Sequence, residues 1–285
     1  MRRRLFEPLS RLKFELPCAE VSGAWLGARL NFREGSAPLG YIPGCNWTQV
    51  LCKGLASMLD AQGVRVLTER SVVGLHGSGG RIATVELADG ERLTAGHVVS
   101  TLPTETYLTL AGGDDTPYLS SIRYTAIVSR VCATRQTITP DFYWMSLTSL
   151  DCNAGGIFML NSLNPTIGGS GEACLNFVTH LHGRDAEFFR RSDEQLLAGY
   201  RDDFRKIWGF ELEPTWTHVT RLPLYSPVFV RGYRNPPVRS TQWQNVYFAG
   251  NYRTFPSIAS TGTALRSGLE AAEAILADAG ETLRP

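Results

Sequence analysis

A glycine turn between a short apolar strand and a helix is the segment best suited to bind a ligand. Residues 245–249 are typical of a short buried strand, and Gly250 and Asn251 follow it directly. After a spacer, residues 261–263 open a predicted helix with leucine and alanine at helical spacing. This order of elements directs backbone N–H groups and the positive end of a helix dipole toward a ligand. The segment therefore predicts a site for an anionic or polar group.

Two histidines, His180 and His182, form an alternative site. Residues two apart on a strand share a face, and two imidazoles so placed can bind a metal ion. No further His, Cys or Asp stands at ligand spacing, so we expect no metal site. The glycines and serine at 168–171 resemble a nucleophile elbow, but Glu172 replaces its last glycine, and we predict a loop there.

Several arginine and aromatic side chains are candidates for contact with a substrate, but each has an ordinary structural explanation as well. Arg123, Arg221 and Arg231 could meet an anionic substrate, although most arginines are simply solvated. Six aromatic residues could line a hydrophobic substrate cavity, and core packing explains them equally well. These aromatic residues are Phe142, Tyr143, Trp144, Tyr225, Phe229 and Tyr233.

The composition limits the class of protein. At about 150 residues per domain, 285 residues predict two domains. A net charge of +1 argues against a nucleic-acid partner, and no apolar run is long enough for a transmembrane segment. The six cysteines are scattered and form no C-x-x-C pair, which favours thiols in a reducing compartment. We therefore expect a globular cytoplasmic protein, and attachment to a membrane surface stays open.

The elements around the glycine turn have an α/β pattern. A helix after Asn46 is predicted to bury Leu51, Leu55, Met58 and Leu59 and to end at Gly63. Strands are predicted at 64–67 and 71–75, then a meander over 82–94 with a hairpin turn at Asp89–Gly90, and a strand at 97–102. The last helix is predicted to bury Leu265, Leu269, Ala272 and Leu276.

The middle of the chain, residues 104–240, reads as β-rich with one clear helix. Ser192 and Gln195 form a capping box at the start of that helix. Its predicted buried stripe consists of Leu197, Tyr200, Phe204 and Ile207.

The terminal segment, residues 245–251 followed by 261–272, resembles the C-terminal flavin motif of the FAD-dependent amine oxidase, protoporphyrinogen oxidase and phytoene desaturase superfamily. Residues 41–44, 63–66, 72 and 98–103 are similar to that superfamily's second FAD-binding segment, and residues 224–228 with 232–233 to the stretch before its last strand. The resemblance implies an α/β (α+β) fold. A partial FAD-binding sheet domain of the glutathione-reductase-like type would comprise residues 38–103 and 241–285, and a β-rich substrate domain residues 1–37 and 104–240.

The resemblance also implies where FAD is contacted. The backbone of Val72 would lie at the adenine, and Gly250 at the ribityl and phosphate groups. Asn251 stands where the superfamily usually has an acid. The strand end would pass close to the cofactor, and the last helix would turn N–H groups to the pyrimidine edge of the flavin. These two segments comprise Thr101, Leu102 and Pro103, and Thr261, Gly262, Thr263 and Ala264.

The implied activity is an FAD-dependent oxidoreductase that moves a hydride from a C–H or C–N bond of a small-molecule substrate, with hydrophobic compounds among the candidates, to flavin N5. No catalytic residue is assigned. Two alternatives remain open: a non-catalytic remnant or partner-binding subunit without flavin, and a redox-neutral flavin mutase.

One expected part of the superfamily pattern is not found. Its members begin with a strand, a G-x-G-x-x-G turn and a helix that bind the FAD pyrophosphate. The glycines at 77–80 instead precede a predicted hairpin. We expect a truncated reading of a longer enzyme, a separate N-terminal FAD-binding half as partner, or a loss of flavin binding. In each case this chain alone should bind FAD weakly or not at all.

Overall fold

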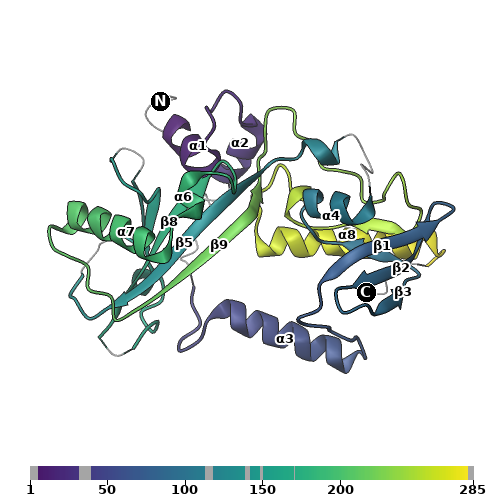
Figure 1. Ribbon diagram of the computed structural model, residues 1–285, viewed down its shortest axis with the longest axis horizontal. Helices are drawn as coiled ribbons and strands as arrows, with labels where there is room; N and C mark the ends of the chain where they lie inside the picture. Colours follow the sequence, from purple (N-terminus) through teal and green to yellow (C-terminus); the bar gives the residue numbers. More distant parts are fainter. Residues whose placement is uncertain are drawn as a thin grey trace. The chain divides into compact units, whose positions relative to one another are not determined.

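The computed structural model describes residues 6–31, 40–112, 118–138, 142–147, 150–169 and 171–281. Helices and open sheets are mixed, as predicted, and the chain forms two compact units (Figure 1). Unit 1 consists of Met1–Cys18, Ser36–Val66 and Tyr124–Tyr225, and unit 2 of Ala19–Gly35, Leu67–Arg123 and Ser226–Pro285. The domains expected above were defined by function, and their boundaries stay a prediction.

Unit 1 is built on a five-stranded sheet in the order β6-β7-β8-β5-β9. Apolar residues of β5 and β8 are buried against α7 and form the core of the unit. The strands are β5 (Tyr124–Thr134), β6 (Trp144–Ser146), β7 (Gly156–Met159), β8 (Ala173–Leu181) and β9 (Trp216–Pro227), and the helices are α1 (Glu7–Phe14), α3 (Trp47–Ala61), α5 (Leu160–Leu163), α6 (Glu187–Arg190) and α7 (Asp193–Trp208).

Helix α7 confirms its predicted start. Ser192 and Gln195 form the capping box, and Tyr200 and Phe204 are buried in the core of unit 1. The ring of Tyr200 stacks on Phe177 of β8 at 5.1 Å. Leu196, rather than the predicted Leu197, is the fully buried leucine at the start of the stripe.

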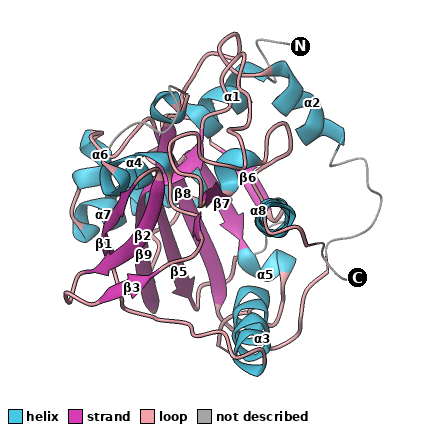
Figure 2. Cartoon of the chain, turned by 90° about the vertical axis from the view of Figure 1, so that its right-hand side faces the viewer, coloured by secondary structure: helices cyan, strands magenta, loops and turns pink. Residues whose placement is uncertain are grey.

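Helix α3 forms where it was predicted, but its apolar face is not buried. The side chain of Asn46 accepts a hydrogen bond from the Thr48 N–H group, which caps the helix. No residue of α3 is buried, and Met58 is 66% exposed. Figure 1 shows α3 apart from the strands of its unit, and in Figure 2 α3 lies below α5. The burial prediction was wrong because the pattern needs a covering surface, and the described residues supply none.

The predicted strand at 64–67 is also wrong. These residues form no β-ladder, and Val64, Val66 and Leu67 are exposed. A strand requires a neighbour to which its backbone can hydrogen-bond. Among the described residues no such neighbour lies beside this segment.

Unit 2 contains a meander and a short parallel pair. The meander, in the order β1-β2-β3, confirms the predicted hairpins, and β10 pairs with β4 in parallel. The strands are β1 (Val72–Ser78), β2 (Arg81–Leu87), β3 (Arg92–Thr94), β4 (Val98–Ser100) and β10 (Val246–Phe248), and the helices are α2 (Gly23–Asn31), α4 (Thr104–Ala111) and α8 (Thr261–Asp278), with 3-10 turns at Leu119–Ser121 and Asn251–Arg253.

A buried asparagine fastens the two sheets of unit 2 together. Asn245, directly before β10, accepts a hydrogen bond from the Ile82 N–H group at 2.9 Å. Its amide donates to the carbonyl oxygens of Ile82 and Gly96 at 2.8 and 3.0 Å. The meander is therefore held directly beside β10 by one side chain.

Helix α8 lies on β10 through small residues. Ala271 and Ala274 pack against Tyr247 and Ala249. The predicted buried stripe was wrong at Leu265 and Leu269, which are 49% and 59% exposed. Alanine allows the helix to approach the sheet closely, so the leucine-bearing face is turned away from it. No helix among the described residues is long and apolar enough to cross a membrane.

The end of α8 is fixed to β10 by a carboxylate that should make stability depend on pH. Arg239 and the Tyr247 hydroxyl both donate to Asp278, at 2.7 Å, and these hydrogen bonds hold the pKa of Asp278 at about 2. Because this value lies below that of the unfolded chain, the stabilisation is complete above about pH 4 and is lost as the pH falls toward 2.

We expect Asp278→Asn to lower the thermal unfolding temperature at pH 7 and to match the parent near pH 2. The control Asp60→Asn, at an exposed position, should have the unfolding temperature of the parent at every pH. The same dependence of unfolding temperature on pH in all three proteins would contradict this assignment.

Candidate functional site

The carboxyl ends of β4 and β10 lie side by side in unit 2. Phe248 is in register with Ser100, and the N–H group of Ala249 donates to the Ser100 carbonyl oxygen at 3.0 Å. The next residues along each strand are Thr101 and Gly250. A Cβ atom on Gly250 would lie 3.5 Å from the Thr101 carbonyl oxygen. The structure thus brings together two segments that are 149 residues apart in the chain, between Thr101 and Gly250.

Gly250 occupies a backbone conformation that only glycine adopts readily. Its φ is 131° and its ψ is −177°. Side chains larger than hydrogen are strained in this region. A Cβ atom would also meet the ring of the buried Tyr252 at 3.2 Å. The turn therefore requires a glycine.

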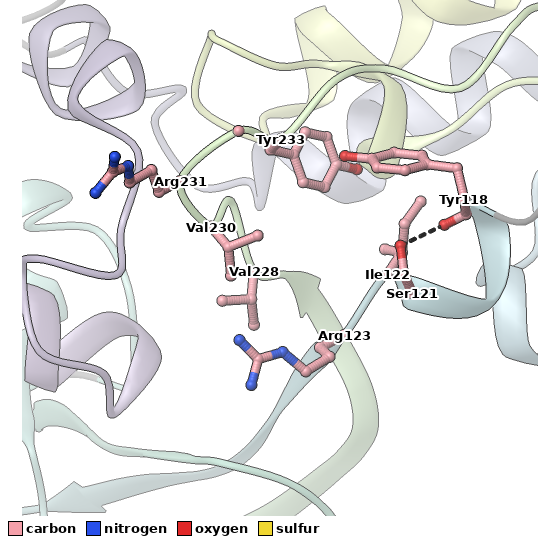
Figure 3. Close-up of a pocket in the computed structure, with 9 residues that line it drawn as sticks. Tyr118, Ser121, Ile122, Arg123, Val228, Val230, Arg231 and Tyr233 are labelled. Atoms are coloured by element: carbon pink, nitrogen blue, oxygen red, sulfur yellow. Dashed lines mark hydrogen bonds between the residues drawn. The ribbon is translucent and has the colours of Figure 1, made fainter.

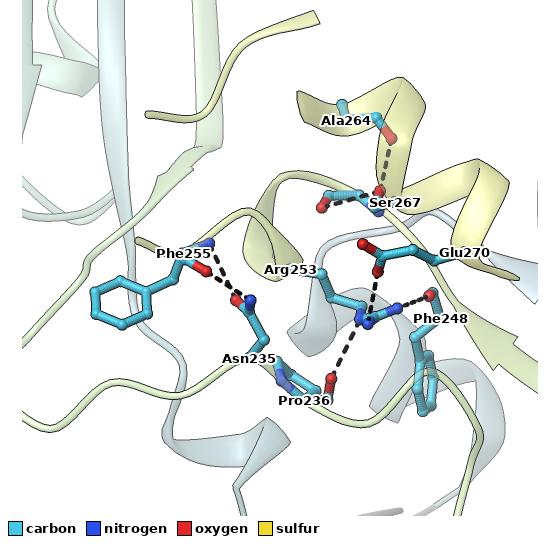
Figure 4. Close-up of polar contacts among 9 residues, drawn as sticks. Asn235, Pro236, Phe248, Arg253, Phe255, Ala264, Ser267 and Glu270 are labelled. Atoms are coloured by element: carbon cyan, nitrogen blue, oxygen red, sulfur yellow. Dashed lines mark hydrogen bonds and ion pairs between the residues drawn. The ribbon is translucent and has the colours of Figure 1, made fainter. Parts of the chain in front are cut away.

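Ser267 joins this turn to α8. The Gly250 N–H group donates to the Ser267 hydroxyl at 2.8 Å, and that hydroxyl donates to the Ala264 carbonyl oxygen at 2.6 Å (Figure 4). Ser267 is itself buried. The turn and the first two turns of α8 are consequently one rigid group.

The N-terminal end of α8 presents backbone donors. Ser260 caps the helix, since it accepts from the Thr263 N–H group through its hydroxyl and from the Ala264 N–H group through its carbonyl oxygen. Within the described chain, the N–H groups of Thr261 and Gly262 have no acceptor. A Cβ atom on Gly262 would meet nothing within 4 Å. This end of the helix is open and can donate to an anionic or polar group.

A buried arginine supports the turn from the other side. Arg253 donates to the carbonyl oxygens of Phe248 and Pro236 at 2.9 and 3.2 Å, and to Glu270 of α8 at 3.1 Å (Figure 4). Burial lowers the pKa of the Arg253 guanidinium from its ordinary value, and the charge of Glu270 opposes this shift. One guanidinium thereby connects β10, the loop before it and α8.

We expect Arg253→Ala to lower the free energy of unfolding by about 2 kcal/mol, because two buried carbonyl oxygens and Glu270 lose their donor. Urea unfolding measures the change. The control Arg266→Ala, on the exposed face of α8, should stay within about 0.5 kcal/mol of the parent. Equal losses in both variants would refute the supporting role of Arg253.

The ten residues expected to contact a cofactor all belong to unit 2. Nine of them lie on the two strand ends and the start of α8 just described. They are Thr101, Leu102, Pro103, Gly250, Asn251, Thr261, Gly262, Thr263 and Ala264. Val72 is placed elsewhere, at the first position of β1, where it pairs with Leu87. The N–H groups of Thr263 and Ala264 are engaged in the cap, so Thr261 and Gly262 are the open donors.

Sequence reasoning missed the residues that hold the site in place. Asn245, Ser267 and Arg253 are polar and buried, and each bonds to segments distant in the chain. Ser100 was missed as well: its hydroxyl is buried at the end of β4 and has no hydrogen-bond partner among the described residues. Of these residues, only Ser267 could have been found from a local pattern, because it is a polar residue on the side of α8 that faces the Gly250 turn.

The other candidates of the sequence are dispersed. The His180 ring lies 5.7 Å from the Tyr225 ring, and the part of the chain that the structure describes holds no cluster of three metal-ligating side chains. Arg221 pairs with Asp193 at 2.7 Å. Phe229, Tyr233 and Phe255 pack edge to face in unit 2, which is core packing.

Comparisons with known proteins point to one family. The family described as flavin containing amine oxidoreductase matches residues 1–276. No curated protein matches the chain. A structure described as a protoporphyrinogen oxidase from Exiguobacterium sp. 255-15 is 16% identical, with a TM-score of 0.66 over 78% of this chain and 50% of its own.

Two further solved structures share the fold. An oxidoreductase from Methanosarcina mazei is 13% identical, with a TM-score of 0.71 over 93% of this chain and 63% of its own. Reduced UDP-galactopyranose mutase is 13% identical, with a TM-score of 0.73 over 97% of this chain and 65% of its own. The chain thus spans between half and two thirds of the length of these three structures.

Proposed function

The chain belongs to the family of flavin-containing amine oxidoreductases, and on this premise we propose that unit 2 binds the flavin of FAD at the Gly250 turn and that the complete protein is an oxidoreductase. The carrying observation is that the β4 end meets the Gly250 turn, and that Ser267 joins this turn to α8, whose N-terminal end is open. Bound FAD supplies a hydride acceptor for a C–H or C–N bond of a small-molecule substrate.

The polar groups at this site fit such a cofactor. The Thr261 and Gly262 N–H groups can donate to the oxygen and nitrogen atoms of the pyrimidine edge, and the helix dipole stabilises negative charge there. The unpartnered Ser100 hydroxyl lies at the end of β4, beside the turn. Asn251 offers an amide where the family usually has a carboxylate, so it can bond to a ribityl hydroxyl without adding charge.

Several surfaces support the further proposal that a βαβ unit with a G-x-G-x-x-G turn completes the FAD site. In unit 2, β4 pairs with no strand other than β10 among the described residues, and Leu265 and Leu269 are exposed. Apolar faces of this kind are normally buried by protein, and an open strand edge accepts another strand. The unit would also supply the pyrophosphate contacts that a G-x-G-x-x-G turn makes.

The location in this proposal is the cytoplasm. All six cysteines are free thiols, as expected of a reducing compartment. Burial raises the pKa of the Cys132, Cys152 and Cys174 thiols, so these three are poor nucleophiles.

Titration with FAD, followed by quenching of flavin fluorescence, tests the proposal. The chain alone should bind FAD weakly or not at all. A fusion protein that carries a G-x-G-x-x-G βαβ unit ahead of residue 1 should bind FAD at least about a hundredfold more tightly, equivalent to about 2.7 kcal/mol. A fusion protein that folds and stays colourless at saturating FAD would favour the non-catalytic alternative. Net electron transfer to an acceptor dye distinguishes an oxidoreductase from a redox-neutral mutase.

A further inference from the structure

A buried positive charge lies directly behind the Gly250 turn. The backbone N–H group of Arg253 donates to the Gly250 carbonyl oxygen at 3.1 Å. The guanidinium of the same residue donates to the carbonyl oxygen of Phe248, two residues before Gly250, at 2.9 Å (Figure 4). Since two residues of chain span at most about 7 Å, the charge lies on the order of 10 Å or less from the turn.

The counter-charge of this arginine is placed unequally. Glu270 accepts from the Arg253 guanidinium at 3.1 Å, but the carboxylate side chain is 44% exposed and the arginine side chain only 6%. Water and salt screen an exposed charge much more than a buried one. Burial lowers the pKa of Arg253, yet an arginine stays protonated at physiological pH. The pair therefore presents a net positive charge to the interior of unit 2 beside the turn.

The position of the charge is fixed. The Arg253 guanidinium also donates to the Pro236 carbonyl oxygen at 3.2 Å, so acceptors from three segments hold it. Glu270 stands one turn after Ser267 in α8, and the Ser267 hydroxyl accepts from the Gly250 N–H group. Consecutive hydrogen bonds thus join the charge, the turn and the helix. A charge held in this way acts on a ligand without first having to reorganise.

The arginines at the small pocket of unit 2, formed by residues 118–123 and 228–233, offer no comparable charge. Arg123 and Arg231 line this pocket, but both are exposed. Figure 3 shows Arg231 turned away from the pocket and Arg123 pointing elsewhere. Water screens both charges, and none of the ten expected cofactor contacts lines this pocket.

We propose that Arg253 raises the reduction potential of the flavin bound at the Gly250 turn and that Glu270 opposes this effect. The inference rests on the proposed flavin site. A hydride brings two electrons and one proton, so the neutral flavin ring becomes an anion while the substrate is oxidised. A fixed positive charge nearby stabilises the reduced form more than the oxidised form. Arg253 thereby makes the flavin a stronger hydride acceptor, as a positioned charge that need not touch the substrate.

The reduction potential of the flavin in the fusion protein, measured against reference dyes, tests this inference. Arg253→Gln removes the charge and keeps an amide donor, so it should lower the potential by at least about 30 mV, equivalent to a tenfold weaker binding of reduced relative to oxidised FAD. Arg253→Lys keeps the charge and should retain most of the potential.

The opposite substitution gives the sharper readout. Glu270→Gln should raise the potential, by less than Arg253→Gln lowers it, because the Glu270 charge is partly in water. Both substitutions break the same ion pair, so a merely structural role would not shift the potential in opposite directions. The control Glu273→Gln removes an exposed carboxylate one turn further along α8 and should leave the potential unchanged.

Two kinds of failure can be told apart. If the fusion protein binds FAD, then a shift of the same sign in Arg253→Gln and Glu270→Gln, or an unchanged potential in both, would overturn this inference alone. Unfolding temperatures identify a variant that fails to fold; Glu270→Gln and Arg253→Lys then decide the outcome by the same criteria. A fusion protein that binds no FAD would overturn the proposed flavin site, and this inference with it.

Discussion

The substitution Gly250→Val is expected to abolish flavin binding and to lower the free energy of unfolding by about 4 kcal/mol. Part of this loss is backbone strain, because a φ of 131° destabilises the fold by about 1–3 kcal/mol when the residue is β-branched. The remainder is overpacking against the buried Tyr252 ring, which adds about 1–3 kcal/mol. Because the turn is bonded to Ser267, a shift of the turn also displaces the start of α8.

Urea unfolding of the chain and FAD titration of the fusion protein measure the two effects of Gly250→Val separately. Gly268→Ala is the matched control, because Gly268 lies in α8 with open space around it. Alanine there should raise stability by about 0.5–1 kcal/mol and leave FAD affinity unchanged. Full FAD affinity in the Gly250→Val fusion protein would show that the turn does not contact the cofactor.

Aspartates at both Leu265 and Leu269 are expected to reduce the FAD affinity of the fusion protein at least about a thousandfold. If the βαβ unit covers this face, the variant loses the burial of two leucines, about 1.5–3 kcal/mol each, and must also desolvate two carboxylates. In the chain alone both positions are exposed, so stability should change little.

Analytical ultracentrifugation of the isolated chain gives an independent readout of the same substitutions. The parent chain should self-associate through its apolar faces, and Leu265→Asp/Leu269→Asp should do so less. Leu222→Asp, an exposed leucine on β9 of unit 1, is the control and should leave FAD affinity unchanged. Full FAD affinity in the double variant would place the covering unit elsewhere.

Local elements were predictable from the sequence because their signals are local. The capping box of Ser192 and Gln195, the Asp89–Gly90 hairpin and the strand before Gly250 all formed as expected. The meeting of Thr101 with Gly250 followed from the family resemblance rather than from periodicity, because no local pattern relates residues so far apart.

Burial was harder to predict than element type. An amphipathic pattern states which face of a helix is apolar, but it does not state which polypeptide covers that face. For α3 the covering surface is not among the described residues, and for α8 the alanine face is the one that packs on β10. The support by Arg253 was equally hidden, since a buried arginine has the same sequence signal as a solvated one.

The FAD dissociation constant of the Gly262→Ala fusion protein, compared with that of Gly268→Ala, tests the flavin site most directly. Both substitutions add one methyl group to α8 where nothing lies within 4 Å, so both should preserve or raise stability. If the flavin packs on the start of the helix, Gly262→Ala weakens FAD binding at least about tenfold, while Gly268→Ala leaves it unchanged. Identical dissociation constants for the two variants and the parent would contradict a flavin at the N-terminus of α8.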